Sequence, residues 1–260
     1  MSHLLAVDVG NTSTVLGLLD SSDKVLHSWR IRTDRALLPD NYALTLRGLL
    51  ELSNSPAPDA AILSSVAPPV GANIRVALER YWKIPTLEVG ANNLDGYISI
   101  EFPEKGAVGA DRLVNMVGAM RYLEPLGYGI VVDFGTATTF DVVAQPNRFL
   151  GGVIAPGPMT SADALFSATA KLPRVALTAP TQAMGRSTVE AIQSGLVFGY
   201  AEMVDGMVRR LSSELPQKPR VIATGGFART LEGICREIEV FDDDVTLRGL
   251  VKIWRDRGGV

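Results

Sequence analysis

The stretch LLAVDVGNTSTVLGLLD, residues 4–20, contains two apolar runs separated by a short polar turn. This pattern predicts a β-hairpin whose first strand ends near Asp8 and whose turn contains Gly10. Glycine permits backbone angles that a β-carbon forbids, and the small polar residues after it place hydrogen-bond donors beside an accessible backbone. A triphosphate with its magnesium ion fits this set, with Asp8 facing the cation. An ordinary hairpin turn also explains these residues, because Gly-Asn is common between paired strands.

The composition limits the class of protein. The chain has 260 residues, of which 47% are hydrophobic, enough for one large domain or two smaller ones. Its net charge of -3 gives no reason to expect a nucleic-acid partner. The single cysteine, Cys235, excludes an internal disulfide and a cysteine metal cluster and favours a cytoplasmic location. No signal segment opens the chain and no apolar run reaches the ~18 residues of a membrane span, so we expect no membrane contact.

Strands alternate with amphipathic helices through the first half of the chain. Asp40 is a candidate N-cap, and apolar residues at helical spacing follow it. A buried strand is predicted at Ala60–Val66, a second helix at Val70–Tyr81 and a further strand at Thr86–Val89. This order predicts an α/β domain with a largely parallel sheet.

The pattern of the opening stretch recurs in GIVVDFGTATTFDVV, residues 129–143. Each copy has an apolar strand, an aspartate, one apolar residue, a glycine and a run of small or hydroxyl residues before a second strand. Such a repeat predicts two related α/β domains that present phosphate-binding hairpins to a shared nucleotide cleft. This resembles the actin and hexokinase (ribonuclease H-like) superfamily, although two unrelated hairpins of similar composition would read the same way. We place the domains at residues 1–115 and 116–244, with a C-terminal helix (245–260) packing back on the first.

Phosphoryl transfer also needs a group that takes the proton of the acceptor hydroxyl. Asp111 is the best candidate, because it stands between a glycine-rich loop and a predicted helix and can project into a cleft. Arg112 beside it can bind an acceptor carboxylate through two parallel hydrogen bonds. The same aspartate is also explained as the helix N-cap, a position that aspartate often occupies.

Three motifs in this order, DVGNT (8–12), GADR (109–112) and DFGTATT (133–139), resemble those of type III pantothenate kinases. The likeness covers nearly the whole chain, and it extends to Trp29-Arg30, Thr33-Asp34, SSV (64–66), GGVIAPG (151–157), KLP (171–173) and ATGG (223–226). It implies an actin-like fold, usually in a homodimer. It also implies transfer of the ATP γ-phosphate to the primary hydroxyl of pantothenate, the first step of coenzyme A synthesis.

The resemblance implies roles for individual residues. Asp111 matches the proton acceptor, and Asp133 matches the ligand of a monovalent cation, potassium or ammonium, while Asp8 remains our candidate for magnesium. The residues that match the ATP site are Asp8, Val9, Gly10, Asn11, Thr12, Ser13, Thr14, Val15 and Thr136. Those that match the pantothenate site are Phe102, Gly109, Ala110, Asp111, Arg112 and Thr188, the last of them acting across the dimer interface.

The helix that contains Thr188 is relevant to the predicted homodimer. Ser187 or Thr188 is predicted to cap a helix that runs to about Leu215. Gly195 and Gly199 lie one turn apart on it and allow another backbone to approach closely. Packing inside a domain is the more common reason for such spacing, but the resemblance places this helix near the subunit interface.

Phe102 departs from the family pattern, in which a tyrosine usually precedes the GADR segment. Its ring can still pack against the gem-dimethyl group of pantothenate. Loss of the hydroxyl contact is worth about 0.5–1.5 kcal/mol, so we expect weaker pantothenate binding without loss of catalysis. Two alternative functions stay open: a nucleotide-sensing regulator of the same fold that phosphorylates no metabolite, and a kinase for another small hydroxy acid.

Overall fold

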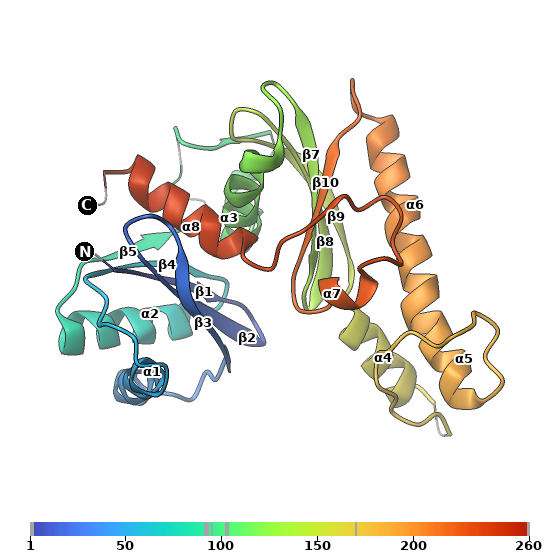
Figure 1. The fold of residues 1–260 in the computed structure, drawn as a ribbon, viewed down its shortest axis with the longest axis horizontal. Helices are drawn as coiled ribbons and strands as arrows, with labels where there is room; N and C mark the ends of the chain where they lie inside the picture. The colour runs from blue at the N-terminus through green and yellow to red at the C-terminus, as the bar shows by residue number, and fades with distance from the viewer. Residues whose placement is uncertain (1–2, 91–93, 95, 102–103, 170, 259–260) are drawn as a thin grey trace. The chain divides into compact units, whose positions relative to one another are not determined.

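The computed structural model describes residues 3–90, 94, 96–101, 104–169 and 171–258, which divide into two compact units (Figure 1). The first unit comprises Met1–Gly118 together with Asp244–Val260, and the second comprises Ala119–Asp243. The division thus follows Gly118, whereas the sequence analysis places a domain boundary after residue 115.

The sheet of the first unit has the strand order β3-β2-β1-β4-β5. β1 (Leu4–Val9), β2 (Ser13–Leu19) and β3 (Val25–Arg32) are antiparallel neighbours. β4 (Ala60–Ser65) pairs with β1 in parallel, and β5 (Thr86–Val89) pairs with β4 in parallel. The predicted hairpin is confirmed, whereas the sheet is mixed rather than largely parallel, with two antiparallel and two parallel strand pairs. Short turns connect the first three strands, and such turns can join only antiparallel neighbours.

Helices cover both faces of this sheet. α1 (Pro39–Leu52) and α2 (Pro68–Ala77) share a buried core with β1 and β4. Leu16 belongs to that core, whereas the next residue, Gly17, faces the opposite side, where Leu247 of α8 (Val245–Asp256) fills the space above it. α1 begins at Pro39, which takes the first helical position, so the predicted N-cap Asp40 lies inside the first turn.

Three further elements of the first unit are short: η1 (Leu78–Trp82), β6 (Ser99–Ile100) and η3 (Lys105–Ala107). α3 (Ala110–Ala119) is longer and packs on α8. At Gly118 and Gly249 the two helix backbones approach so closely that a β-carbon on either residue would lie 2.0 Å from a carbonyl oxygen of the other helix. This contact attaches the C-terminal helix to the first unit.

The sheet of the second unit contains β11-β10-β7-β8-β9 in that order. β7 (Tyr128–Phe134), β8 (Ala137–Ala144) and β9 (Arg148–Pro156) are antiparallel neighbours. β10 (Arg220–Thr224) and β11 (Val240–Phe241) are added in parallel beside β7. The strand order and directions therefore match those of the first unit, as an internal repeat predicts.

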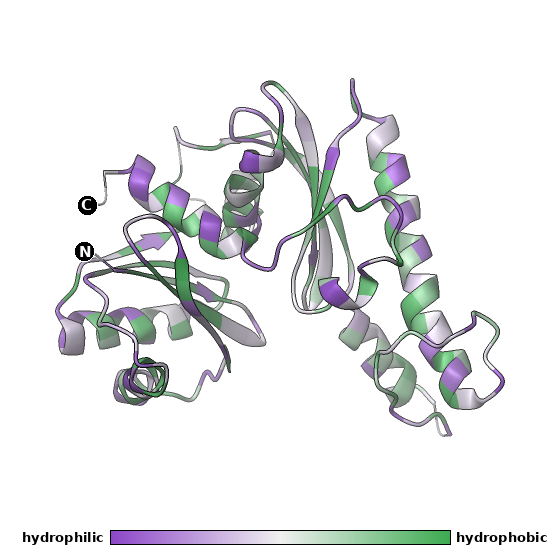
Figure 2. Ribbon diagram, in the orientation of Figure 1, coloured by the Kyte–Doolittle hydropathy of each residue, from purple (hydrophilic) through white to green (hydrophobic). Residues whose placement is uncertain are grey.

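One face of this second sheet packs on α6 (Tyr200–Ser213), whose apolar side forms a core with β7, β8 and β10. Figure 2 shows hydrophobic and hydrophilic residues alternating along α6, as expected for a helix with one buried face. The other helical elements are η4 (Met120–Tyr122), α4 (Pro158–Ser167), α5 (Thr188–Ser194), the π-helical η5 (Gly195–Gly199) and α7 (Ala228–Leu231).

The strand register shows how the two copies of the repeat differ. Val9 pairs with Thr14 in the first hairpin, whereas Phe134 pairs with Thr138 in the second. The second turn is therefore one residue shorter, and Thr138 is the counterpart of Thr14, at a spacing of 124 rather than 125 positions. Within the described part of the chain, no helix is both long enough and apolar enough to cross a membrane.

Candidate functional site

The first hairpin turn is held by a dense set of hydrogen bonds. The Gly10 amide donates to the carbonyl oxygen of Ser13 (3.1 Å), and a β-carbon on Gly10 would lie 2.8 Å from that oxygen. Thr33, which follows β3, donates its amide to the carbonyl of Thr12 (2.9 Å) and its hydroxyl to the carbonyl of Gly10 (2.8 Å). Asn11 and Thr12 at the tip are exposed. Hydrogen bonds from Thr33 thus hold the backbone of the turn, while its tip is open to solvent.

Asp8 stands at the end of β1, where its side chain is half-buried. The hydroxyl of Ser64 donates to its Oδ1 atom over 2.5 Å, because β4 places Ser64 directly beside Asp8 in register. This hydrogen bond fixes the orientation of the carboxylate. The sequence motif contained Ser64, but sequence analysis assigned it no role.

Two arginines that sequence analysis left without a role also reach this turn. Arg35 donates to Oδ1 of Asn11 (3.3 Å), and Arg30 donates to the hydroxyl of Ser13 (3.2 Å). Both guanidinium groups are exposed, and they bring positive charge to a turn predicted to bind an anion. The contact of Arg30 depends on strand register, which places the arginine opposite Val15, and not on a local motif.

Asp111 is the second residue of α3, so it does not occupy the N-cap position. Its carboxylate turns back over Gly109, where a β-carbon would lie 2.5 Å from Oδ1, and it accepts the Arg112 amide at 2.8 Å. Burial raises the pKa of Asp111, while the Arg112 amide and charge oppose the shift. Gly109 must lack a side chain for this carboxylate to keep its position.

One strand end connects this segment to the first hairpin. The Val66 amide donates to the carbonyl of Val9 (2.9 Å), and the Val66 side chain lies 3.7 Å from the β-carbon position of Gly109. The first unit therefore brings the predicted residues 8–15 and 109–112 to one edge of its sheet. Phe102 lies outside the residues that the structure describes.

The second hairpin turn has a comparable backbone. Gly135 donates to the carbonyl of Ala137 (3.1 Å), and Gly157, which follows β9, donates to the carbonyl of Thr136 (3.0 Å). The hydroxyl of Thr160 in α4 donates to the same Thr136 carbonyl over 2.6 Å. Thr136 itself is exposed at the tip of the turn.

Asp133 is the half-buried residue between Val132 and Phe134, which are both buried, near the end of β7. Gly225, with φ +95, lies so close to it that a β-carbon would be 2.4 Å from Asp133 Oδ1. In the described part of the chain, no cluster of three or more histidine, cysteine, aspartate and glutamate side chains converges to hold a metal.

Thr188 is exposed at the first position of α5. Ser187 is the N-cap, since its hydroxyl accepts the Glu190 amide at 3.2 Å. Thr188 borders a shallow hollow lined by apolar residues of α4, α5 and η5. No described atom outside the helix and its immediate neighbours lies within 4 Å of a β-carbon built on Gly195 or Gly199. The more common explanation of these glycines, that they allow close packing inside the unit, is therefore wrong for the described structure.

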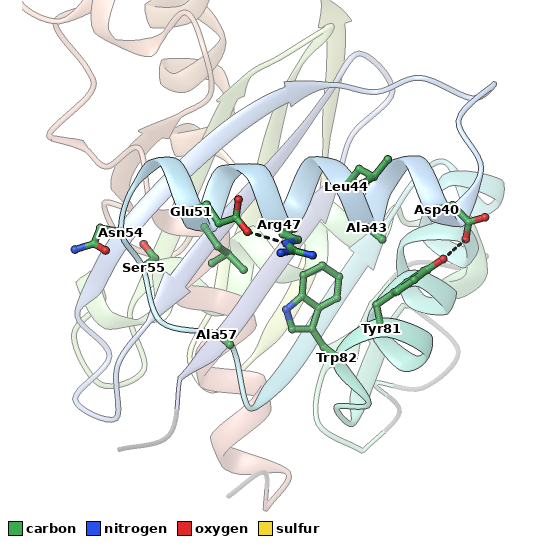
Figure 3. Close-up of a pocket in the computed structure, with 11 residues that line it drawn as sticks. Asp40, Ala43, Leu44, Arg47, Glu51, Asn54, Ser55, Ala57, Tyr81 and Trp82 are labelled. Carbon is green, nitrogen blue, oxygen red and sulfur yellow. Dashed lines mark hydrogen bonds and ion pairs between the residues drawn. The ribbon is translucent and has the colours of Figure 1, made fainter.

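A pocket of about 770 Å³ lies elsewhere, between α1 and η1 of the first unit (Figure 3). Trp82 lines it, and its polar side chains pair with one another: Arg47 with Glu51 (2.7 Å) and Tyr81 with Asp40 (2.7 Å). None of the predicted site residues lines this pocket. This pocket is therefore not the site that the sequence motifs predict.

Comparison with known proteins agrees with the motifs. The family model of type III pantothenate kinase matches residues 4–210. A type III pantothenate kinase of Deinococcus radiodurans is 57% identical over 99% of this chain and 98% of its own, and one of Thermus thermophilus is 51% identical over 98% and 100%. A solved structure, the inorganic polyphosphate/ATP-glucomannokinase of an Arthrobacter strain, shares the fold at 14% identity, with a TM-score of 0.52 and 98% of each chain covered. The predicted actin- and hexokinase-like fold class is confirmed, and the chain belongs to the type III pantothenate kinase family.

Proposed function

We propose that this chain transfers the γ-phosphate of ATP to the primary hydroxyl of pantothenate and so carries out the first step of coenzyme A synthesis. The observation that carries the proposal is the 57% identity, over nearly the full length of both chains, to a relative named type III pantothenate kinase. The two glycine turns and the Asp111 segment supply the kinds of group that phosphoryl transfer requires. We further propose that the two units act as the two domains of the enzyme.

In this proposal the two turns bind the phosphates of ATP. Backbone amides and the hydroxyl residues of 8–15 contact them in the first unit, and Thr136 does so in the second. Arg30 and Arg35, already bonded to the first turn, add positive charge beside the phosphates. Backbone hydrogen bonds from Thr33 and Gly157 hold the two turns in place. The turns therefore need little reorganisation when the nucleotide binds.

Asp8 and Asp133 fit the cations that the family implies. Both are half-buried carboxylates at strand ends, and hard cations prefer such oxygen ligands. We assign magnesium to Asp8 and a monovalent cation, potassium or ammonium, to Asp133. When bound, these ions offset the charge that builds up on the phosphates during transfer.

Asp111 is the proposed proton acceptor. It takes the hydroxyl proton of pantothenate as that oxygen bonds to the γ-phosphorus and the bond to ADP breaks. Burial supports this role, because it raises the pKa of Asp111 and makes the carboxylate a stronger base. Arg112, with Thr188, Gly109, Ala110 and Phe102, binds the rest of pantothenate.

A homodimer is part of the proposal, because Thr188 is assigned to the pantothenate site of the partner subunit. Two features of the second unit support it. Apolar side chains of α4 stay partly exposed near Thr188, among them Leu165 and Phe166, each 37% exposed. The two glycines of η5 also leave open space on the surface. We also propose a cytoplasmic setting, which the single buried thiol of Cys235 suits.

A substrate panel tests the proposal. Purified protein is incubated with ATP, magnesium and potassium, and with pantothenate or other small hydroxy acids, while ADP release is followed. We expect ADP release that depends on pantothenate and falls when sodium replaces potassium. Release with another hydroxy acid alone would make the protein a different kinase. Nucleotide binding without any acceptor-dependent release would favour a regulator.

A further inference from the structure

The two hairpin turns are supported by the same backbone contact. Thr33 is the residue after β3 and Gly157 is the residue after β9, and the register of the strands makes them counterparts. Each donates its amide to a carbonyl in the adjoining turn, over 2.9 Å from Thr33 to Thr12 and over 3.0 Å from Gly157 to Thr136. Apart from the one-residue difference in length, the two turns therefore differ in the side chains that support them.

In the first unit, Thr33 also supplies a hydroxyl. The Thr33 hydroxyl lies 3.0 Å from that of Thr14, which is fully buried. Because Thr33 gives its one hydroxyl proton to the carbonyl of Gly10, Thr14 must be the donor in the bond between the two threonines. A buried threonine of β2 is thus connected to the turn through a second hydroxyl.

The second unit cannot use the same residue. A β-carbon on Gly157 would lie 2.2 Å from the carbonyl oxygen of Gly135 and 2.5 Å from that of Thr136, so no side chain fits there. Thr138, the fully buried counterpart of Thr14, still needs a partner. Tyr200, the first residue of α6, supplies it: its phenol bonds to the Thr138 hydroxyl and donates to the carbonyl of Pro156 over 2.9 Å.

Tyr200 is held in place and keeps its proton. It is 7% exposed, its ring centroid is 6.4 Å from that of Phe134, and it meets Phe227 edge-on at 6.5 Å. Burial raises the pKa of Tyr200, while the Thr138 hydrogen bond opposes that shift. The phenol therefore stays protonated near neutral pH and donates to Pro156, and Thr138 must donate to the phenol.

We infer that Tyr200 is a positioning residue for the second phosphate-binding turn and does from α6 what Thr33 does locally for the first. One hydroxyl joins the strand that leaves this turn, β8 at Thr138, to the strand that supports it, β9 at Pro156. Its ring contacts the phenylalanines of two motifs, DFGT and TGGF. The functional consequence for ATP rests on the function proposed above, whereas the effect on the turn does not.

The test uses isosteric changes in the full-length protein. Tyr200→Phe removes the phenol hydroxyl, Thr138→Val removes its partner, and Thr138→Ser keeps a hydroxyl at that position. Ser212→Ala is the matched control on the same helix, because it deletes a half-buried hydroxyl that bonds only within α6, to the carbonyl of Val208 at 2.7 Å. The readouts are the Kd for ATP with magnesium, hydrogen exchange of residues 134–138 in the free protein, and the KM for pantothenate.

We expect Tyr200→Phe and Thr138→Val each to weaken ATP binding on the order of tenfold and to speed exchange at 134–138. Thr138→Ser and Ser212→Ala should match the unaltered protein, and the double variant should be no worse than either single one. The KM for pantothenate should stay within about twofold. If Tyr200→Phe leaves both exchange and ATP affinity at the level of Ser212→Ala, the inference is wrong.

The two claims fail in different ways. A protein that binds ATP but forms no phosphorylated pantothenate contradicts the proposed function, while a weakened Kd in Tyr200→Phe still supports the inference. If no ATP binding is measurable at all, exchange at 134–138 alone decides the role of Tyr200. If Tyr200→Phe does not fold, Thr138→Val against Thr138→Ser tests the same bond.

Discussion

At the scale of single residues, Asp111 shows a conflict between function and stability. Its carboxylate is placed over Gly109 at the start of α3, where burial disfavours its charged form. The same burial makes it a better base, provided that the proton has been lost before the substrate binds. Active-site groups often have such shifted pKa values. The raised pKa of Asp111 leads to one prediction about activity and one about stability.

The first concerns activity against pH. Asp111 must be deprotonated to accept a proton, so kcat/KM should fall as the pH drops through its raised pKa. Because the shift is upward from 3.8, the acidic limb should be centred above that value. The measurement is kcat/KM for pantothenate from about pH 4 to 9. A profile that stays flat down to pH 4 would show that Asp111 is not the base.

The second concerns stability. The folded-state pKa of Asp111 lies above the unfolded value, so the folded protein holds the proton longer, and this site loses stability as pH rises between the two values. Asp111→Asn removes the buried charge and keeps an acceptor for the Arg112 amide. Its Tm should exceed that of the unaltered protein at pH 7, with the difference vanishing below about pH 3.8. A lower Tm at pH 7 would indicate that the charge stabilises the fold.

The sequence alone points to candidate residues that have a local signal, and it gives no role to residues whose contacts depend on the fold. Asp8, Asp111 and Asp133 stand in glycine-containing motifs, so their positions were readable. Tyr200 was not, because an aromatic residue on the apolar side of a helix is explained fully by core packing. Arg35 comes near Asn11 only through the course of the chain after β3.

At the scale of elements, the hairpins were predictable but the pairing around them was not. Alternation of apolar runs and turns located β1, β2, β7 and β8, and the motif repeat indicated that they belong to equivalent hairpins. The one-residue difference in turn length is hidden in the sequence, where Ser13 aligns with Thr138. Register shows that Thr14 is the counterpart of Thr138, since Thr14 pairs with Val9 as Thr138 pairs with Phe134. A shift of one residue reverses which side chains face the core, so only the structure shows that Thr138 is buried.

A third prediction tests the turn after β10. Gly225→Ala and Gly233→Ala both place a side chain at positive φ, +95 and +78, but only the first crowds Asp133. Gly233→Ala should lose about 1 kcal/mol or somewhat more of unfolding free energy. Gly225→Ala should lose more, because its β-carbon would also lie 2.5 Å from the Phe134 amide nitrogen. Gly225→Ala alone should also lose turnover, about 10²-fold, because Asp133 is displaced. Urea unfolding compares the stability of the two variants, and steady-state kinetics compares their turnover. Equal turnover in both variants would show that catalysis does not depend on the position of Asp133.

At the scale of the whole molecule, a fourth prediction concerns assembly. Leu165→Asp places a charge among the apolar residues beside Thr188, whereas Leu52→Asp places one on α1 at a side chain that is already 89% exposed. Light scattering should find a dimer for the unaltered protein and for Leu52→Asp, and a monomer for Leu165→Asp. The monomer should also show a raised KM for pantothenate, since Thr188 is assigned to the partner's site. A Leu165→Asp variant that remains dimeric would place the interface elsewhere.

The central claim is that the chain phosphorylates pantothenate with Asp111 as the proton acceptor. The most direct test is mass-spectrometric measurement of 4'-phosphopantothenate formed from ATP, magnesium, potassium and pantothenate, together with the Kd for ATP. The unaltered protein should form one phosphopantothenate for each ATP consumed. Asp111→Asn should form it at about 10²–10⁴-fold lower rate while binding ATP with nearly the same affinity. No product from the unaltered protein, or near-normal turnover by Asp111→Asn, would contradict the account.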